Sequence, residues 1–362
     1  MIVLCRPDLT DAQRERLLAA VRSLGVEPFS RMEGDRAVFE VPAAADAARC
    51  DIERLAGVER VFVGEPGAHL ATWDARNVAT RVRVGDVEFG GPQTLVIAGP
   101  CAVESLDVLL EIARAVKAAG AHVLRGGAFK PRTSPYDFRG LGREGLEHLA
   151  AARAETGLPI VTEVLDTRDV ELVERYADVL QVGSRNMHNF ALLQEVGRAG
   201  KPVLLKRGMN ATIDEMLTSA EYVLSGGNAQ VILCERGIRT FETSTRNTLD
   251  LSAVPLLHER THLPVVVDPS HASGRRSLVP ALARAAAAVG ADGVMMEVHV
   301  RPAEARCDAK QAILPAELAA IVRDVAGIDR ALRRTGAAGP VPPESPATKP
   351  VPSKSVATEA AR

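Results

Sequence analysis

Eight apolar segments, each followed by a helical stretch, make up the chain from residue 94 onward. In order they are TLVIAGP, HVLRGG, PIVTEV, VLQVG, PVLLKRG, VILCERG, PVVVDPSH and GVMMEVH. Regular alternation of strand and helix is typical of a parallel sheet covered by helices. Eight such units predict an α/β fold, a (β/α)8 TIM barrel, which we assign to residues 94–335.

The segments outside the barrel have different textures. Residues 1–70 alternate in the order β-α-β-β-α-β, which predicts a small α+β ferredoxin-like domain. Residues 71–93 are expected to form a linker and a β-hairpin that turns at Gly85 and Asp86. Residues 336–362 consist mostly of Pro, Ala, Ser and Lys with almost no apolar side chains to bury, so we expect a disordered tail.

The overall composition excludes several classes of protein. The 44 Lys and Arg nearly balance the 46 Asp and Glu, which gives no electrostatic reason to bind nucleic acid or a membrane. The five cysteines are far apart with no CxxC pair, which argues against a disulfide framework or a structural zinc finger. The apolar start MIVLC is too short for a signal peptide. We therefore expect a cytoplasmic protein.

Charged side chains close several of the predicted strands. In a parallel barrel the active site lies at the carboxyl ends of the strands. Because side chains alternate along a strand, an apolar residue facing the barrel interior directs the residue two positions later inward as well. This rule brings five side chains into one cup, namely Arg125, Glu163, Lys206, Arg236 and Glu297.

The cations of this cup indicate an anion site. Burying Arg125, Lys206 and Arg236 together costs several kcal/mol for each unpaired ion, so an anion such as phosphate is expected between them. Lys130 can add a fourth cation. Nearby residues offer a second anion or hydroxyl site, namely Arg132, Thr133 and Ser134. The alternative is a set of ordinary salt bridges at the barrel rim.

A second group of side chains is suited to a metal ion. Cys101 closes the first strand, His271 follows the seventh, Glu297 ends the eighth and Asp308 lies just beyond it. A thiolate, an imidazole and two carboxylates favour Mn²⁺, Fe²⁺, Co²⁺ or Zn²⁺ over Ca²⁺ or Mg²⁺. Each of the four also has a structural alternative, as a buried thiol, a loop cap, an ion-pair partner or a turn residue. His299 and Cys307 are substitute ligands or groups that support the ligands.

Several of these stretches together resemble one enzyme family. They are AGPCAVES, LRGGAFKPRTSPYDFRGLG, QVGSRN, PVLLKRG, ILCERGIRTFE, TRNTLD and VVDPSHASGRR. Over residues 94–320 the chain resembles the 3-deoxy-D-arabino-heptulosonate-7-phosphate (DAHP) synthases of the type I-beta subfamily. The resemblance implies a transferase of the first step of the shikimate pathway. That step condenses phosphoenolpyruvate with erythrose 4-phosphate and water to give DAHP and phosphate.

The resemblance also implies residue roles. It implies that one divalent metal ion is bound by Cys101, His271, Glu297 and Asp308. It implies that phosphoenolpyruvate is bound by Arg125, Lys130, Lys206 and Arg236, with the backbone around Gly183 and Ser184. It implies that erythrose 4-phosphate is bound by Arg132, Thr133 and Ser134. We further expect Lys130 to transfer a proton and Glu163 to orient the attacking water, with His271 acting in catalysis through the metal.

The family suggests partners and rivals as well. Related N-terminal domains close over the barrel mouth when tyrosine or phenylalanine binds, so an aromatic amino acid effector is expected at this domain. A homo-oligomer, a tetramer, is also expected. The rival on the same fold is 3-deoxy-8-phosphooctulonate synthase, whose acceptor loop resembles KANRTS where this chain has KPRTS. A more distant alternative is a non-catalytic barrel that binds phosphate or metal.

Overall fold

The protein is represented by a computed structural model of the whole chain. It describes residues 2–23, 28–33, 36–41, 49–62, 70–73, 75, 78–131, 134 and 136–334. The predicted acceptor-loop residues Arg132 and Thr133, and the predicted tail, lie outside the described residues.

Eight parallel strands close into a barrel, which confirms the fold predicted from the sequence. The strands are β7 (Leu95–Gly99), β8 (Val123–Arg125), β9 (Ile160–Val164), β10 (Val179–Val182), β11 (Val203–Lys206), β12 (Val231–Glu235), β13 (Val265–Val267) and β14 (Gly293–Glu297). The last strand pairs with the first from Gly293 to Glu297, opposite Leu95 to Gly99. This pairing brings the chemistry-bearing ends of β14 and β7 side by side.

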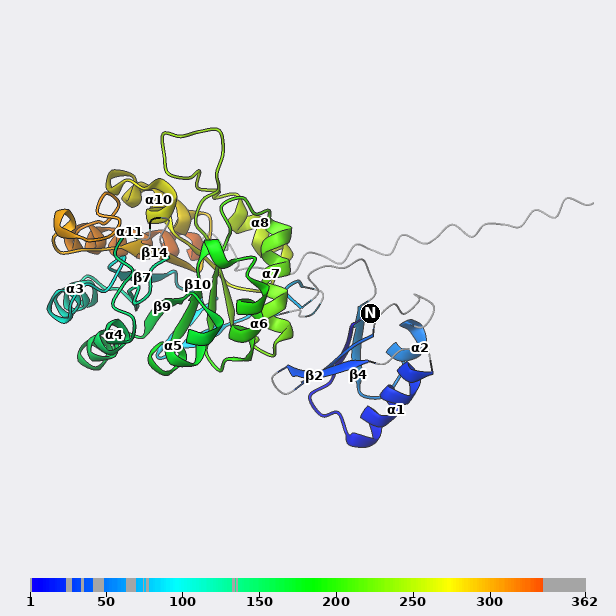
Figure 1. Cartoon of the computed structure of the whole chain (residues 1–362). Coiled ribbons are helices and arrows are strands. Elements are labelled where there is room, and N and C mark those ends of the chain that lie inside the picture. Colours follow the sequence, from blue (N-terminus) through cyan, green and yellow to red (C-terminus); the bar gives the residue numbers. More distant parts are fainter. Residues whose placement is uncertain are drawn as a thin grey trace, which may run out of the picture.

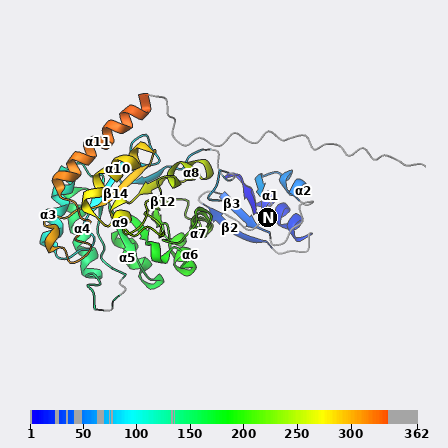
Figure 2. The ribbon, with the colours of Figure 1, turned by 90° about the horizontal axis from the view of Figure 1, so that it is seen from above.

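Helices surround the strands (Figures 1 and 2). They are α3 (Leu106–Ala118), α4 (Arg143–Thr156), α5 (Val170–Tyr176), α6 (Phe190–Arg198), α7 (Ile213–Ser225), α8 (Ala253–Arg260), α9 (Pro269–Ser273), α10 (Val279–Ala288) and α11 (Pro315–Arg334). Side-chain oxygens define several starts: Ser105 accepts a hydrogen bond from Val108 N at α3, and Thr212 forms a capping box with Glu215 at α7. The apolar faces of the helices and the outward strand residues form one continuous core.

A separate core fills the barrel interior and fixes which side chains reach the mouth. It contains the five residues from which the inward direction was inferred, namely Val123, Val161, Leu204, Cys234 and Met295. All five are at most 2% exposed. Because side chains alternate along a strand, the residues two positions later also point to the barrel axis at its open end.

The predicted hairpin exists, and it belongs to the barrel. Strands β5 (Val82–Val84) and β6 (Val87–Phe89) pair antiparallel across Gly85 and Asp86. Val82, Val84 and Phe89 are buried in the same interior core as the barrel strands. We expected the hairpin to lie between the domains, but it packs against the barrel interior, where its three apolar side chains are buried.

The N-terminal residues form a four-stranded antiparallel sheet in the order β2-β3-β1-β4. Its elements are β1 (Ile2–Cys5), α1 (Asp11–Arg22), β2 (Phe29–Glu33), β3 (Arg36–Glu40), α2 (Arg49–Glu53) and β4 (Val58–Phe62). It has its own apolar cluster, which includes Val3, Leu17 and Phe39. The sheet lies beside the α7 side of the barrel in both views (Figures 1 and 2).

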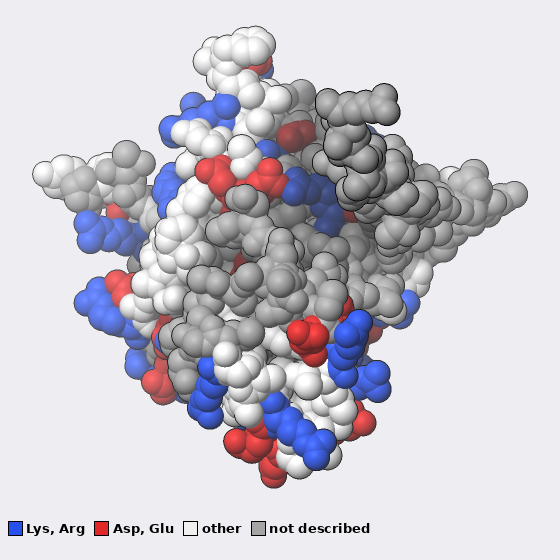
Figure 3. Space-filling model, turned by 90° about the vertical axis from the view of Figure 1, so that its right-hand side faces the viewer, with Lys and Arg blue, Asp and Glu red and all other residues white. Residues whose placement is uncertain are grey.

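Surface charge is mixed and no described helix could span a membrane. On the coloured part of the face in Figure 3, basic and acidic side chains alternate with uncharged ones. In the part of the chain that the structure describes, every helix is too short or too polar to cross a bilayer.

One buried contact ties the last helix to the first barrel strand, and its loss should destabilise the fold. The Asp329 carboxylate of α11 accepts hydrogen bonds from Thr94 N (2.9 Å) and Thr94 Oγ1 (2.7 Å). Asp329→Ala leaves the buried backbone N of Thr94 without its acceptor, whereas Thr94 Oγ1 can still donate to Ala291 O at 3.1 Å, so we expect a loss of about 1–3 kcal/mol in the free energy of unfolding. Asp329→Asn keeps one acceptor oxygen and should lose less. Denaturant unfolding measures both, and a loss below about 0.5 kcal/mol for Asp329→Ala would contradict this role.

Candidate active site at the barrel mouth

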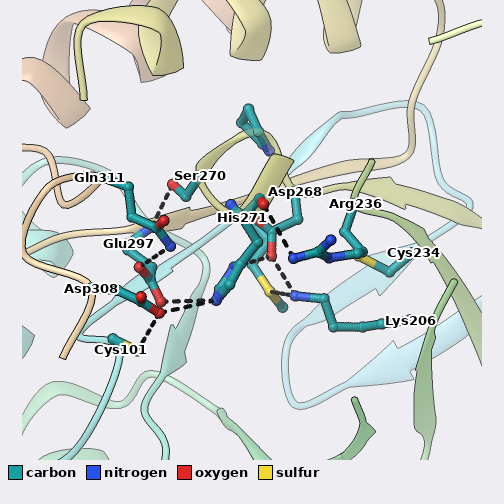
Figure 4. A network of polar contacts seen from close by, with 12 residues as sticks. Cys101, Lys206, Cys234, Arg236, Asp268, Ser270, His271, Glu297, Asp308 and Gln311 are labelled. Carbon is teal, nitrogen blue, oxygen red and sulfur yellow. Dashed lines mark hydrogen bonds and ion pairs between the residues drawn. The ribbon is translucent and has the colours of Figure 1, made fainter. Parts of the chain in front are cut away.

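Four potential metal ligands converge where β14 meets β7 (Figure 4). One donor atom from each of Cys101, His271, Glu297 and Asp308 lies within 4.8 Å of all the others. His271 Nε2 is 3.1 Å from Glu297 Oε1 and 4.0 Å from Asp308 Oδ2. Cys101 Sγ is 3.3 Å from Asp308 Oδ2. One ion could therefore contact all four side chains after small movements.

Further side chains hold these ligands in place. His271 Nδ1 is 2.6 Å from Asp268 Oδ2, which directs Nε2 towards the other ligands. Asp268 also accepts from the backbone N of His271, as the N-cap of α9. Gln311 donates to Glu297 Oε2 at 2.7 Å. Such supports are characteristic of a built metal site rather than of an exposed acidic cluster.

The electrostatics of this cluster favour ionised carboxylates. Burial alone would raise the pKa of Glu297, but His271 and Arg125 outweigh burial and hold it well below its usual value. Burial lowers the pKa of His271, yet Asp268 and Glu297 reverse the effect and raise that pKa to about 9. The imidazole of His271 is therefore protonated and forms a cation among these carboxylates.

The predicted cations line a single cavity next to this cluster. The cavity has a volume of about 90 Å³. Its lining includes nearly all the described residues that the sequence assigned to substrate, namely Arg125, Lys130, Gly183, Ser184, Lys206 and Arg236, together with Glu163, His271 and Asp308. Residues separated by more than a hundred positions in the chain therefore line one cavity, as expected from the alternation of side chains along each strand.

Two of the three inward cations have carboxylate partners inside the site. Arg125 donates to Glu297 Oε1 at 2.7 Å, and Lys206 Nζ forms an ion pair with Asp268. Arg236 instead donates to the backbone oxygens of His271 (3.1 Å) and Gly237 (3.4 Å) and has no ion pair among the described residues. Burial lowers the pKa of Arg236. Two of the three predicted cations are therefore neutralised by carboxylates of the site itself, and Arg236 is the one that most needs an added anion.

Lys130 lies between the cation cavity and the candidate ligands. Its Nζ donates to the backbone oxygen of Cys101 at 3.1 Å. Burial lowers the pKa of Lys130, but Cys101 and Glu163 outweigh burial and raise it above its usual value. Gly183 lies close to Glu163, because a Cβ at position 183 would be 1.9 Å from Glu163 Oε1 and would have to displace that carboxylate. The site thus combines a firmly protonated amine with a carboxylate across a small cavity.

Sequence reasoning missed some residues of the site. Arg185 and Arg246 also line the cavity, and Asp268 pairs with both Lys206 and His271. Arg185 directly follows Ser184, and Arg246 lies in the TRNTLD stretch, so the motifs already contained both. Asp268 could have been found from its position three residues before His271, at the start of a short helix.

The substitute ligands take different positions. His299 is buried and its Nδ1 accepts from Arg301 N at 3.0 Å, while its Nε2 has no hydrogen-bond partner among the described residues. It is not one of the four clustered donors. Cys307 is buried, and its Sγ is 2.9 Å from Cys101 Sγ. Ser134 is described and lies in the loop beyond Lys130.

Comparison with known sequences identifies the family. A sequence profile of the DAHP synthetase I family matches residues 74–332. The chain belongs to this family. A family relative from Thermotoga maritima, named phospho-2-dehydro-3-deoxyheptonate aldolase, is 45% identical over 314 residues, covering 86% of this chain and 93% of the relative. A 2-dehydro-3-deoxyphosphooctonate aldolase from Syntrophotalea carbinolica is 34% identical over 267 residues, covering 68% of this chain and 95% of that protein.

Solved structures of DAHP synthases also match. The crystal structure of the Thermotoga maritima DAHP synthase superposes with a TM-score of 0.73 and 42% identity, covering 91% of this chain and 97% of that one. A truncated form of the 3-deoxy-D-arabino-heptulosonate 7-phosphate synthase of the same organism gives a TM-score of 0.69 and 46% identity, covering 73% of this chain and 97% of that one.

Proposed function

We propose that this DAHP synthase family member condenses phosphoenolpyruvate with D-erythrose 4-phosphate and water to give DAHP and phosphate. The observation that carries the proposal is a cavity lined by the four predicted cations directly beside a metal-type donor set, two members of which, His271 and Asp308, also line that cavity. The name of the Thermotoga maritima relative supports the same reaction. In this reading the protein carries out the first step of the shikimate pathway towards chorismate and the aromatic amino acids.

Phosphoenolpyruvate fits the cation cavity by charge. It carries a phosphate and a carboxylate, and we propose that Arg125, Lys130, Lys206 and Arg236 hold these groups, with the backbone at Gly183 and Ser184. Arg236 has no carboxylate partner among the described residues, so it contributes most directly to anion binding. The same cations stay bound to the phosphate as it leaves, which stabilises the charge that develops there.

The donor set fits a transition-metal ion. A thiolate, an imidazole and two carboxylates, held by Asp268 and Gln311, match the preferences of Mn²⁺, Fe²⁺, Co²⁺ or Zn²⁺. We propose that Cys101, His271, Glu297 and Asp308 bind one such ion. When bound, the ion supplies Lewis-acid polarisation of the acceptor aldehyde.

The remaining chemistry falls to Lys130 and Glu163. Carbon 3 of phosphoenolpyruvate forms a bond to the aldehyde carbon, and the aldehyde oxygen takes a proton, which we assign to the Lys130 ammonium. Its raised pKa keeps the amine protonated at neutral pH. Water oriented by Glu163 then adds to carbon 2, and the C–O bond to phosphate breaks to leave the ketone of DAHP. One water proton restores the Lys130 ammonium and the other leaves with the phosphate. We propose that the acceptor, erythrose 4-phosphate, is bound by Ser134 together with Arg132 and Thr133.

The acceptor sugar decides between this proposal and its rival. Curated relatives named 2-dehydro-3-deoxyphosphooctonate aldolase share 32–34% identity with the chain, so arabinose 5-phosphate is the second candidate acceptor. Pro131 stiffens the acceptor loop where the rival has KANRTS, which favours the shorter, four-carbon sugar.

Side-by-side assays with the two sugars test the choice. Phosphate release from phosphoenolpyruvate should depend on erythrose 4-phosphate, with kcat/KM at least about tenfold above that for arabinose 5-phosphate. A chelator should abolish the release and Mn²⁺ should restore it. Preference for the pentose phosphate would establish the rival activity. Absence of phosphate release with either sugar would favour a non-catalytic barrel.

The proposal extends to the assembly and the regulation of the protein. We propose a homo-oligomer, a tetramer, and feedback inhibition by an aromatic amino acid bound to the N-terminal domain of residues 1–70. The separate apolar cluster of that domain supports treating it as a unit of its own. We also propose that residues 94–335 form the catalytic unit and that the protein works in the cytoplasm.

A further inference from the structure

A buried ion cluster joins two neighbouring strand ends at the barrel mouth. Arg207 follows β11 and Glu235 ends β12, and both side chains are at most 6% exposed. Arg207 Nη1 is 2.9 Å from Glu235 Oε2 and 3.0 Å from Asp250 Oδ2. Arg207 Nε also donates to the backbone oxygen of Ala211 at 2.9 Å. None of these four residues lines the cation cavity, so the cluster can act on that cavity only through other residues.

Alternation along the strands places the ion pair directly behind two of the cavity cations. Lys206 and Arg236 line the cavity, so their chain neighbours Arg207 and Glu235 point away from it. Strand β11 pairs with β12 so that Lys206 lies opposite Cys234, and Arg207 N donates to Cys234 O at 2.9 Å. The same register, continued by one residue, sets Arg207 opposite Glu235. The ion pair therefore ties together the two strand ends that carry Lys206 and Arg236.

The other contacts of Arg207 hold two further parts of the cavity wall. Asp250 lies four residues after Arg246, whose side chain lines the cavity. Ala211 closes the turn that carries Met209, another lining residue. One buried guanidinium thus contacts segments that supply three cations and an apolar side chain to the same cavity.

The cost of burying this cluster argues for a role in geometry rather than in stability. Burial outweighs the pull of Arg207 and raises the pKa of Glu235. Buried ion pairs are often no more stabilising than apolar pairs of the same size. Their directed hydrogen bonds, however, fix the positions of the groups that they join. Here Glu235 Oε1 also accepts from Gly237 N, which fixes the backbone just after Arg236.

The cavity cations need such a restraint from outside. Burial lowers the pKa of Arg236, Asp268 partly offsets burial, and Arg246 lowers that pKa further by repulsion. Like charges at close range are pushed apart unless the backbone that carries them is held. Arg236 has no ion pair of its own among the described residues.

We infer that Arg207 is a positioning residue that holds the cations of the cavity at the spacing that one bound anion requires. It acts through Glu235 and Asp250 on the segments that carry these cations. Cations that are already in place bind an anion more tightly, because binding then costs less ordering. The role rests on the proposed function where the anion is phosphoenolpyruvate, whereas the hold on the cations applies to inorganic phosphate as well.

Titration calorimetry on the full-length protein can test this role. The double variant Arg207→Met with Glu235→Gln removes both charges of the buried pair, so that neither is left alone. We expect the Kd for phosphoenolpyruvate and the Kd for inorganic phosphate to rise at least about tenfold in the Zn²⁺-loaded protein. The affinity of the metal-free protein for Zn²⁺ should stay within about threefold of the parent, because the cluster forms no ion pair with the four proposed ligands.

Two further variants make the result specific. Arg153→Met with Asp178→Asn removes an ion pair of 2.9 Å between α4 and the residue just before β10, at the other end of the barrel, and should bind both anions like the parent. Arg207→Lys keeps both buried charges, so it should fold even where the double variant does not. It replaces the guanidinium fork with a single ammonium and should weaken the binding of both anions about two- to fivefold.

The outcomes separate this role from the proposed function. Anion Kd values within twofold of the parent in the double variant, or in Arg207→Lys where the double variant fails to fold, would overturn the positioning role. An equal loss of affinity for anions and for Zn²⁺ would indicate a general structural role and would overturn it too. A parent that binds inorganic phosphate but not phosphoenolpyruvate would overturn the proposed function, and the phosphate values would still decide the role of Arg207. A parent that binds neither would overturn both.

Discussion

Replacement of His271 by alanine should lower kcat/KM for DAHP formation by at least about 1000-fold and remove the bound metal ion. The imidazole supplies one of four donors within 4.8 Å of one another, and no other nitrogen donor stands in that group. Its loss also leaves the carboxylates of Asp268 and Glu297 without their shared cationic neighbour. Initial rates with added Mn²⁺ and metal content per chain measure the two effects.

A matched control separates chemistry from folding. His148 lies on α4, away from the cavity, and His148→Ala should keep the metal and stay within about twofold of the parent rate. Cys101→Ser tests the same site through a smaller change and should also lose metal affinity, since a hydroxyl is a poor ligand for these ions. Retention of one tightly bound ion and a tenth of the rate in His271→Ala would contradict the assignment.

Lys130→Met should reduce kcat by about 100- to 10,000-fold, because it removes the amine assigned to protonate the aldehyde oxygen. Methionine is similar in length and apolar, so it fills the space without offering a proton. The protein should still bind the metal ion, because the hydrogen bond that Lys130 donates goes to the backbone oxygen of Cys101 and not to its sulfur. Single-turnover assays with phosphoenolpyruvate and erythrose 4-phosphate measure the chemical step directly.

Two further variants identify the cause of that loss. Lys130→Arg keeps the positive charge but replaces the compact ammonium with a larger, planar guanidinium that cannot place a proton at the same point, so it should recover binding of phosphoenolpyruvate and little of the rate. Lys117→Met, on the outer helix α3, should behave like the parent. Turnover of Lys130→Met within tenfold of the parent would show that another group transfers the proton.

The sequence was sufficient to predict the barrel and the side chains that enter its mouth. Alternation along each strand is a local property, so an apolar residue such as Val123 or Leu204 reports the direction of the charged residue two positions later. Closure of the barrel then brings Cys101 near Glu297, because the first and last strands of a closed sheet must be neighbours. Both inferences need only the order of the strands.

Other features depend on contacts that no local pattern encodes. The ion pair between Lys206 and Asp268 joins two non-adjacent strands, and its geometry follows from the packed interior. The position of the hairpin could not be predicted either, because the apolar side chains of Val82 and Phe89 could equally have packed between the domains. The contact between Cys101 and Cys307 depends on the turn at Asp308, which the spacing of the residues does not reveal.

The most direct test of the proposed metal centre is an anomalous-difference map from crystals of the protein soaked in Zn²⁺. The account predicts one peak per chain at about 2.0–2.3 Å from Cys101 Sγ, His271 Nε2 and a carboxylate oxygen of each of Glu297 and Asp308. A peak elsewhere on the barrel, or one bound by His271 with Cys101 Sγ more than about 4 Å away, would contradict it.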